Sequence, residues 1–238
     1  MAADFIINVA ASLAFVLLGY SLSRIQHWFL HFSFRSIWKP FLKDKHALVV
    51  LSTRPGPYPR STPRVSLVEM QAYIEISKLS GRLGINMVPV SSETSMDEIR
   101  SNNIILLGSS LANAVTAKMW RTVSDKLPFV FHVDKQYLSI GDREFIPVED
   151  EDGQLVTDYG LIIRQVHPFN SEKALVLAMG CHGFSTYGSM RMMTEIENAR
   201  RLLKATANKD FIALIEVRLQ DKRLISSRIV ECYILPQL

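Results

Sequence analysis

The stretch ALVLAMGCHGFSTYGSMRMMTEIENARRLLKA, residues 174–205, decides the fold class. Its apolar opening, residues 174–180, is typical of a buried strand, and residues 185–205 repeat apolar positions at helical spacing. Between them lies a joint crowded with glycines, hydroxyl side chains, a cysteine and a histidine. A strand, a glycine-rich joint and a helix form the repeating unit of an α/β sheet. The sequence therefore predicts a sheet covered by helices.

The same alternation runs through the chain on both sides of this stretch. Upstream, strands and helices are predicted in turn over residues 47–52, 65–83, 85–90, 95–100, 103–108 and 109–127. A hairpin at Gly141-Asp142, a strand over 159–166 and a closing antiparallel pair, 211–219 and 223–235, add further strands. The predicted fold class is α/β, with an N-terminal transmembrane helix followed by a Rossmann-like, mostly parallel sheet with added antiparallel strands.

The N-terminal segment FIINVAASLAFVLLGYSL, residues 5–22, carries no charge. As a helix its 18 residues rise about 27 Å, close to the hydrocarbon thickness of about 30 Å. The basic residues of this region come after the apolar run and not before it, which favours a retained anchor over a cleaved signal peptide. The positive flank predicts a single-pass protein of the inner membrane with its C-terminal domain in the cytoplasm.

One face of the predicted span is weakly polar. We therefore expect the span to contact other protein helices as well as the lipid bilayer. The residues of this face fall within an arc of about 60° of the helix circumference. They are Asn8, Ser12, Gly19 and Ser23. Such a stripe indicates either a close helix–helix contact or a pore lining, and both interpretations imply a homo-oligomer.

Charge and cysteine content limit the classes of function. Residues 1–46 carry five Lys and Arg against two Asp, whereas the remainder carries 22 basic against 21 acidic side chains. A nearly neutral domain is not suited to long nucleic acids. We divide the chain into residues 1–45, a transmembrane helix with an amphipathic juxtamembrane segment, and residues 46–238, a cytoplasmic α/β ligand-sensing domain. The juxtamembrane aromatic residues expected at the lipid headgroups are Trp28, Phe29, Phe32 and Trp38. Two cysteines give no zinc spacing, and no metal or cofactor is predicted.

Three joints follow the carboxyl ends of predicted parallel strands, where open α/β sheets bind ligands. Helices that begin there would direct free N–H groups and a positive dipole end at a phosphate. Arginines could add bidentate contacts. The predicted ligand-binding residues are Arg54, Tyr58, Arg60, Ser109, Ser110, Asn113, Gly180, His182, Gly183, Ser185 and Thr186. Neither glycine-rich joint matches G-x-G-x-x-G or the Walker pattern. The alternative interpretation is purely structural: these residues build turns and helix caps.

A catalytic role for Cys181 is the rival interpretation. A thiol at a helix N-terminus has a lowered pKa and is a better nucleophile. No base with an orienting third group can be assigned, however, so no catalytic residue is predicted. The alternative function is a membrane-anchored enzyme that processes nucleotides in the same crevice. Glu69, on the first predicted helix, is expected on a solvated face.

Three segments carry a family resemblance: NNIILLGSSLANAVTAKM (102–119), DYGLIIRQVHPFN (158–170) and ALVLAMGCHGFSTYGSMR (174–191). Together with the anchor, they resemble the nucleotide-sensing membrane effectors of bacterial antiphage systems of the Hailong and cyclic-oligonucleotide types. The resemblance implies a non-enzymatic effector that binds a nucleotide or short oligonucleotide. It also implies a functionally paired nucleotidyltransferase that makes this signal, and an ion channel or membrane-disrupting output.

Overall fold

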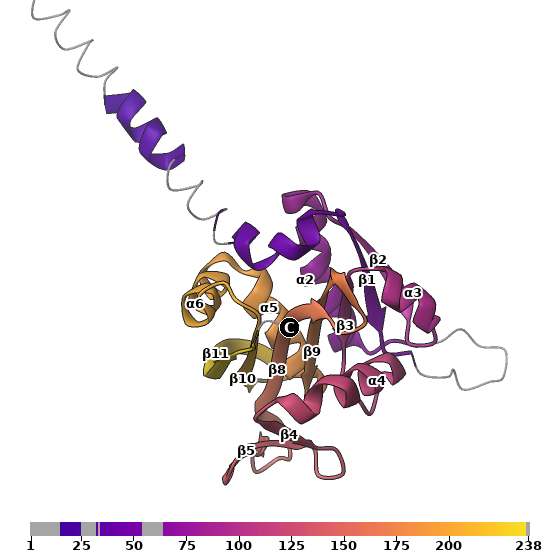
Figure 1. Ribbon diagram of the computed structural model, residues 1–238. Coiled ribbons are helices and arrows are strands. Elements are labelled where there is room, and N and C mark those ends of the chain that lie inside the picture. Colours follow the sequence, from indigo (N-terminus) through magenta and orange to yellow (C-terminus); the bar gives the residue numbers. More distant parts are fainter. Residues whose placement is uncertain (1–14, 25–31, 33, 54–63, 237–238) are drawn as a thin grey trace, which may run out of the picture.

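The computed structural model describes residues 15–24, 32, 34–53 and 64–236. Its centre is an eight-stranded sheet with the order β11-β10-β8-β9-β3-β1-β2, and β7 pairs with β8 (Figure 1). A second, three-stranded sheet has the order β4-β5-β6. The strands of the large sheet are β1 (His46–Leu51), β2 (Asn86–Ser91), β3 (Ile104–Leu107), β7 (Val148–Glu149), β8 (Leu155–His167), β9 (Asn170–Gly180), β10 (Phe211–Gln220) and β11 (Arg223–Ile234). Those of the small sheet are β4 (Phe129–His132), β5 (Tyr137–Ile140) and β6 (Arg143–Phe145).

The large sheet is parallel in one half and antiparallel in the other. β2, β1, β3 and β9 pair in parallel, whereas β8, β10 and β11 pair antiparallel. The mixed α/β class is confirmed, but the sheet is less parallel than predicted. The reason lies in the connections. Two residues separate β8 from β9, and Asp221 and Lys222 join β10 to β11 at φ values of 50° and 59°. Such short turns can connect only antiparallel strands.

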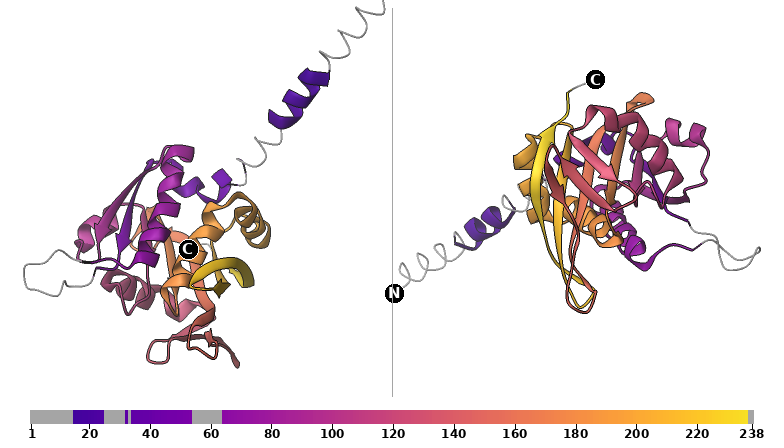
Figure 2. Two further views of the ribbon diagram at one scale, coloured as in Figure 1. Left: turned by 180° about the vertical axis from the view of Figure 1, so that it is seen from behind. Right: turned by 90° about the horizontal axis from the view of Figure 1, so that it is seen from below.

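Helices cover both faces of the sheet (Figure 2). α2 (Leu67–Leu83), α5 (Gly183–Thr194), α6 (Ile196–Thr206) and the 3-10 helix η1 (Lys39–Leu42) pack on one face. α3 (Met96–Ser101), α4 (Ala114–Val123), the 3-10 helix η2 (Ser124–Lys126) and the small sheet lie on the other. Consecutive residues of β1 and β3 alternate between the two apolar cores, which explains their unbroken apolar runs.

Two predicted helices differ from the observed ones. The helix predicted from residue 109 begins only at Ala114, because a turn occupies residues 110–112 and the Asn113 side chain caps the first helical turn. The helix predicted over 185–205 is divided at Glu195, whose backbone is extended. The division lets α5 lie almost fully buried while α6 presents one apolar side.

Residues 15–24 form a helix that stands apart from the domain (Figure 1). Its apolar side chains are exposed to solvent, from 77% for Phe15 to 58% for Leu18. Among the residues that the structure describes, no helix is both long and apolar enough to span a membrane. Most of the predicted span, with Asn8 and Ser12, lies outside the described residues; Gly19 and Ser23 lie on the exposed helix.

Residues 34–41 belong to the folded core. Phe34, Ile37, Trp38 and Phe41 are at most 1% exposed and pack with α2, α5 and α6. Trp38 was expected at the lipid headgroups, but its indole Nε1–H donates to the carbonyl of Met193, 3.1 Å away, inside the domain. The predicted division at residue 46 thus cuts through this core.

Candidate functional site

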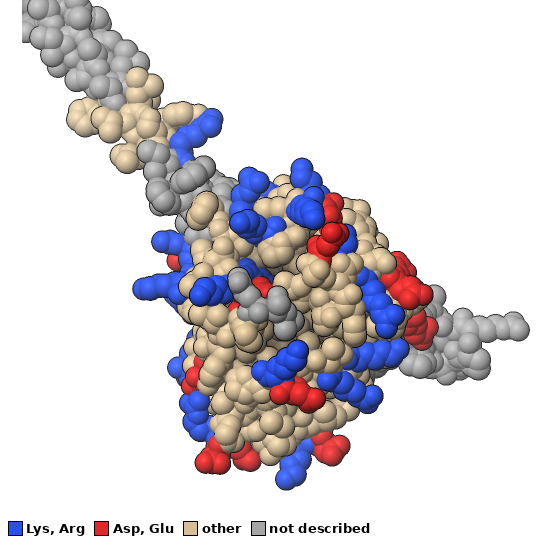
Figure 3. Space-filling model, in the orientation of Figure 1, with Lys and Arg blue, Asp and Glu red and all other residues tan. Residues whose placement is uncertain are grey.

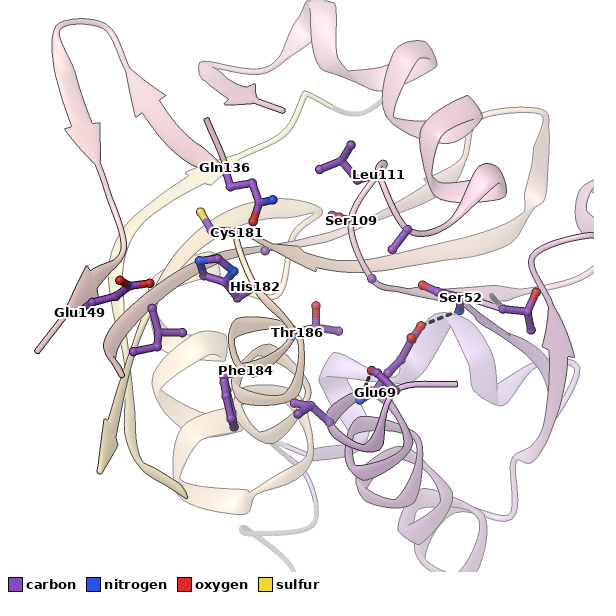
Figure 4. A pocket seen from close by; sticks show the side chains of 18 of the residues that line it. Ser52, Glu69, Ser109, Leu111, Gln136, Glu149, Cys181, His182, Phe184 and Thr186 are labelled. Carbon is purple, nitrogen blue, oxygen red and sulfur yellow. Dashed lines mark hydrogen bonds between the residues drawn. The ribbon is translucent and has the colours of Figure 1, made fainter. Parts of the chain in front are cut away.

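A cavity of about 760 Å³ opens at the carboxyl ends of β1, β3 and β9 (Figure 4). Its volume lies within the range of about 300–1,000 Å³ that is usual for small-molecule sites. It is lined by Ser52, Thr53, Ser66, Val68, Glu69, Gly108, Ser109, Leu111, Ala112, Gln136, Glu149, Gly153, Leu155, Gly180, Cys181, His182, Gly183, Phe184 and Thr186. The two glycine-rich joints, after β3 and after β9, thus share one cavity.

The strand order explains why the cavity forms there. β1 is followed by α2 on one face of the sheet, whereas β3 is followed by α4 on the other. Because the two connections leave in opposite directions, the ends of these neighbouring strands are left uncovered. This is the switch point at which open α/β sheets bind ligands.

Gly180 and Ser185 bring α5 close to the sheet. A Cβ atom at Gly180 would overlap the Ser185 Oγ and come within 2.7 Å of the Ser185 Cβ and 3.0 Å of the Tyr159 carbonyl oxygen. Ser185 is fully buried, and its Oγ donates to the His182 carbonyl at 2.8 Å. Gly180 therefore lets α5 approach the sheet, and Ser185 packs beneath the cavity without lining it.

Asp158 holds the N-terminus of α5. This fully buried side chain on β8 accepts hydrogen bonds from the backbone N–H groups of Tyr159 (2.9 Å), His182 (3.2 Å) and Ser185 (2.8 Å). His182 is the N-cap of α5 but makes no side-chain cap, so the carboxylate of a neighbouring strand takes that role. Burial raises the pKa of Asp158, although the hydrogen bonds from Ser185 and the charge of His182 act in the opposite direction.

Glu69 contributes a second carboxylate, and the expectation that it lies on a solvated face is wrong. Its side chain is 6% exposed, and Oε1 accepts a hydrogen bond from the backbone N–H of Ser52 at 2.6 Å (Figure 4). Gly108, at φ 93°, makes room for this arrangement, because a Cβ there would overlap the Ser52 hydroxyl and touch the Glu69 carboxylate. Helical periodicity could not identify Glu69, since its partner lies beyond the helix, at the end of β1.

The predicted site residues fall into three groups. Ser109, Gly180, His182, Gly183 and Thr186 line the cavity. Ser110, Asn113 and Ser185 do not. Arg54, Tyr58 and Arg60 lie outside the described residues.

Asn113 is not available to a ligand. Its side-chain oxygen accepts from the N–H groups of Val115 and Thr116, and its amide donates to the carbonyls of Val50 and Leu107. These four hydrogen bonds use the full capacity of the side chain. Asn113 therefore positions α4 and joins β1 to β3.

The hydroxyls of Ser109 and Thr186 make no hydrogen bond to any residue that the structure describes, and both side chains border the cavity (Figure 4). Thr186 is 2% exposed. Buried hydroxyls normally find a hydrogen-bond partner. These two groups can therefore donate to, or accept from, a molecule in the cavity.

The described wall of the cavity is acidic. Glu69 and Glu149 line it, and no Lys or Arg does so within residues 64–236 or the described part of the N-terminal segment. The Asp158 carboxylate already satisfies N–H groups at the start of α5. The Asp158 carboxylate thus opposes the predicted binding of phosphate by this helix end. Because Asp158 lies on β8, far from α5 in the sequence, no local sequence pattern predicted its place here.

Cys181 is not an activated thiol. The expectation of a lowered pKa is wrong, because burial raises the pKa of this thiol and the neighbouring charge of Asp158 raises it further. The thiol is 5% exposed and packs in the core on the α4 face of the sheet. It has the environment of a small structural side chain.

Comparison of the chain with protein-family models and with curated proteins finds no match.

Proposed function

We propose that this chain is a membrane effector whose α/β domain binds a nucleotide-type ligand, with the nucleoside portion in the cavity. The observation that carries this proposal is the meeting, at one strand-end cavity, of two glycine-rich joints and two hydroxyls, Ser109 and Thr186, that have no partner among the described residues. The parallel half of the sheet, with the order β2-β1-β3-β9, supports a Rossmann-like description of this part.

The chemistry of the wall favours a hydroxyl-bearing ligand. The carboxylate of Glu149 is a strong acceptor for sugar hydroxyls and for the amino groups of bases. Backbone at Gly183, which lines the cavity without a side chain, allows close approach of the ligand. The size of the cavity suits a mononucleotide or part of a short oligonucleotide.

α5 connects the cavity to the N-terminal segment. Its first turns border the cavity through Gly183 and Thr186, and its last turn accepts the Trp38 indole hydrogen bond at Met193. Arg82 adds a second link, donating to the Thr194 carbonyl at 3.3 Å and lying 5.7 Å from the Phe34 ring. A shift of α5 on ligand binding would therefore also move residues 34–41, which contact its last turn.

The effector function would be carried out in the membrane by the N-terminal helix. The exposed apolar side chains of residues 15–24 are unsuited to water and suit lipid or a second copy of the same helix. We therefore infer a single-pass protein of the inner membrane with a cytoplasmic domain. In this arrangement, copies associate through the small-residue face that includes Gly19 and Ser23, and a paired nucleotidyltransferase supplies the signal. Such an effector acts in antiphage defence as an ion channel or by disrupting the membrane.

Ligand binding is tested by thermal unfolding of the full chain in detergent with mononucleotides and short cyclic oligonucleotides. A ligand at about 100 times its Kd stabilises the folded state by about 2.7 kcal/mol, which raises the midpoint temperature by several degrees. The double variant Ser109→Ala/Thr186→Val removes both hydroxyls and is expected to lose most of this shift. The same nucleotide should alter ion flux through liposomes that contain the protein.

Thr122→Val is the matched control, because Thr122 lies on α4 and its hydroxyl bonds only the Lys118 carbonyl, away from the cavity. This variant should keep the full shift. A shift that survives in the double variant would move the ligand away from this cavity. The absence of a shift with every nucleotide would end the proposal of a nucleotide sensor.

A further inference from the structure

Unpaired basic side chains lie on two segments of the domain, residues 34–42 and the stretch from α6 to β10. Five Lys and Arg there are exposed, and none forms an ion pair with a residue that the structure describes. We call them the basic face: Arg35, Lys39, Arg201, Lys204 and Lys209.

A buried arginine joins the two parts of the basic face. Arg164, on β8, donates to the carbonyls of Ile37 (3.1 Å), Asn208 (2.9 Å) and Lys209 (2.7 Å) and is only 3% exposed. Its guanidinium thus fixes Ile37, just before η1, against the segment that follows α6. Arg35 and Lys39 are thereby held on the same side of the domain as Lys209.

The acidic side chains of the same region have basic partners of their own. Asp44 pairs with Lys173 at 2.8 Å, Glu197 with Arg200 at 3.6 Å and Glu195 with Arg191. The basic face therefore keeps an excess of positive charge, although the domain as a whole is almost neutral. Figure 3 shows several Lys and Arg on the side of the domain nearest residues 15–24, and others over the rest of this face.

We propose that the basic face binds the anionic phospholipid headgroups of the bilayer. This inference rests on the membrane attachment in the proposed function and adds a second, electrostatic contact made by the folded domain. In Figure 1 the exposed apolar helix, residues 15–24, lies beyond the side of the domain that carries α6, so a bilayer that holds this helix would lie nearest that side. Exposed basic residues close to an anionic leaflet attract it over about one Debye length.

Flotation of the full chain with vesicles tests the proposal. The protein is diluted from detergent into vesicles of neutral phosphatidylcholine, or of phosphatidylcholine with about 30 mol% phosphatidylserine. The wild-type chain should bind the anionic vesicles at least about tenfold more tightly, and this preference should weaken as salt is raised. The variant Arg201→Gln/Lys204→Gln/Lys209→Gln should lose most of the preference and keep its binding to neutral vesicles.

A control of equal charge is available on the opposite face of the sheet, with three exposed residues on and after α4. The variant Lys118→Gln/Arg121→Gln/Lys126→Gln should keep the lipid preference. Equal binding of the wild-type chain to both vesicles would overturn this inference alone. If the wild-type chain did not bind neutral vesicles, that result would instead count against the membrane anchor itself. Displacement of the wild-type chain from anionic vesicles by a short RNA, but not of the Arg201→Gln/Lys204→Gln/Lys209→Gln variant, would make the basic face a nucleic-acid site and overturn the lipid assignment.

Discussion

Replacing Gly180 with alanine is expected to lower the free energy of unfolding by about 3 kcal/mol, because the new methyl group has no space. It would overlap the Ser185 hydroxyl and press on the Tyr159 carbonyl, which belongs to a sheet strand and cannot move freely. α5 would be pushed from the sheet, and its cavity-lining residues Gly183 and Thr186 would move with it. Urea denaturation of the full chain in detergent measures the loss, and any ligand-induced thermal shift should disappear.

Two variants separate overcrowding from the general effect of adding a methyl group. Gly81→Ala, at an exposed position of helix α2 with nothing within 4 Å of the added atom, should stabilise the protein by about 0.5–1 kcal/mol. Adding Ser185→Gly to Gly180→Ala removes the nearest obstacle and should restore part of the stability. If Gly180→Ala alone is neutral, α5 does not depend on the close approach described above.

Replacing Asp158 with alanine should cost about 3 kcal/mol of unfolding free energy, because three backbone N–H groups lose their acceptor. Asp158→Asn should cost less, since its amide oxygen can still accept from Tyr159 and His182 while Ser185 faces an amide donor. α5 should fray at its N-terminus, and hydrogen exchange at His182 and Ser185 should accelerate. Unchanged protection of these two amides in Asp158→Ala would contradict the capping role.

The same residue predicts a pH dependence of defined sign. Burial raises the pKa of Asp158 above its ordinary value of 3.8, so the folded state binds this proton more tightly than the unfolded state. The stabilising contribution is therefore fully present below 3.8 and is lost as the pH rises through the folded pKa. The stability advantage of wild type over Asp158→Asn should shrink as the pH rises from 3.8 through the folded pKa. An advantage that grows over this range would show that the pKa is lowered instead.

The sequence predicted the elements and the place of the cavity well, because both depend on local signals. Apolar runs and turn residues located the strands, and the joints after β3 and β9 share the cavity because both strands are parallel and adjacent. The carboxylates of the site were missed for the opposite reason. Asp158 and Glu69 act on backbone groups 24 and 17 residues away along the chain, and no spacing pattern reports such contacts.

The juxtamembrane segment shows a second limit. Its aromatic residues have the composition of a lipid-facing surface, and pattern alone cannot separate that environment from a protein core. Phe34 and Trp38 are buried because they belong to one apolar core with side chains of α2, α5 and α6. Only the tertiary arrangement distinguishes the two cases.

This burial fixes the smallest fragment of the chain that can exist on its own in water. Phe34, Ile37, Trp38 and Phe41 each contribute about 1.5–3 kcal/mol by leaving solvent, so together they supply about 6–12 kcal/mol. The whole stability of a domain is commonly about 5–15 kcal/mol. A truncation that starts at residue 46 would discard most of that margin, whereas one that starts just before Phe34 would retain it and still omit the apolar helix.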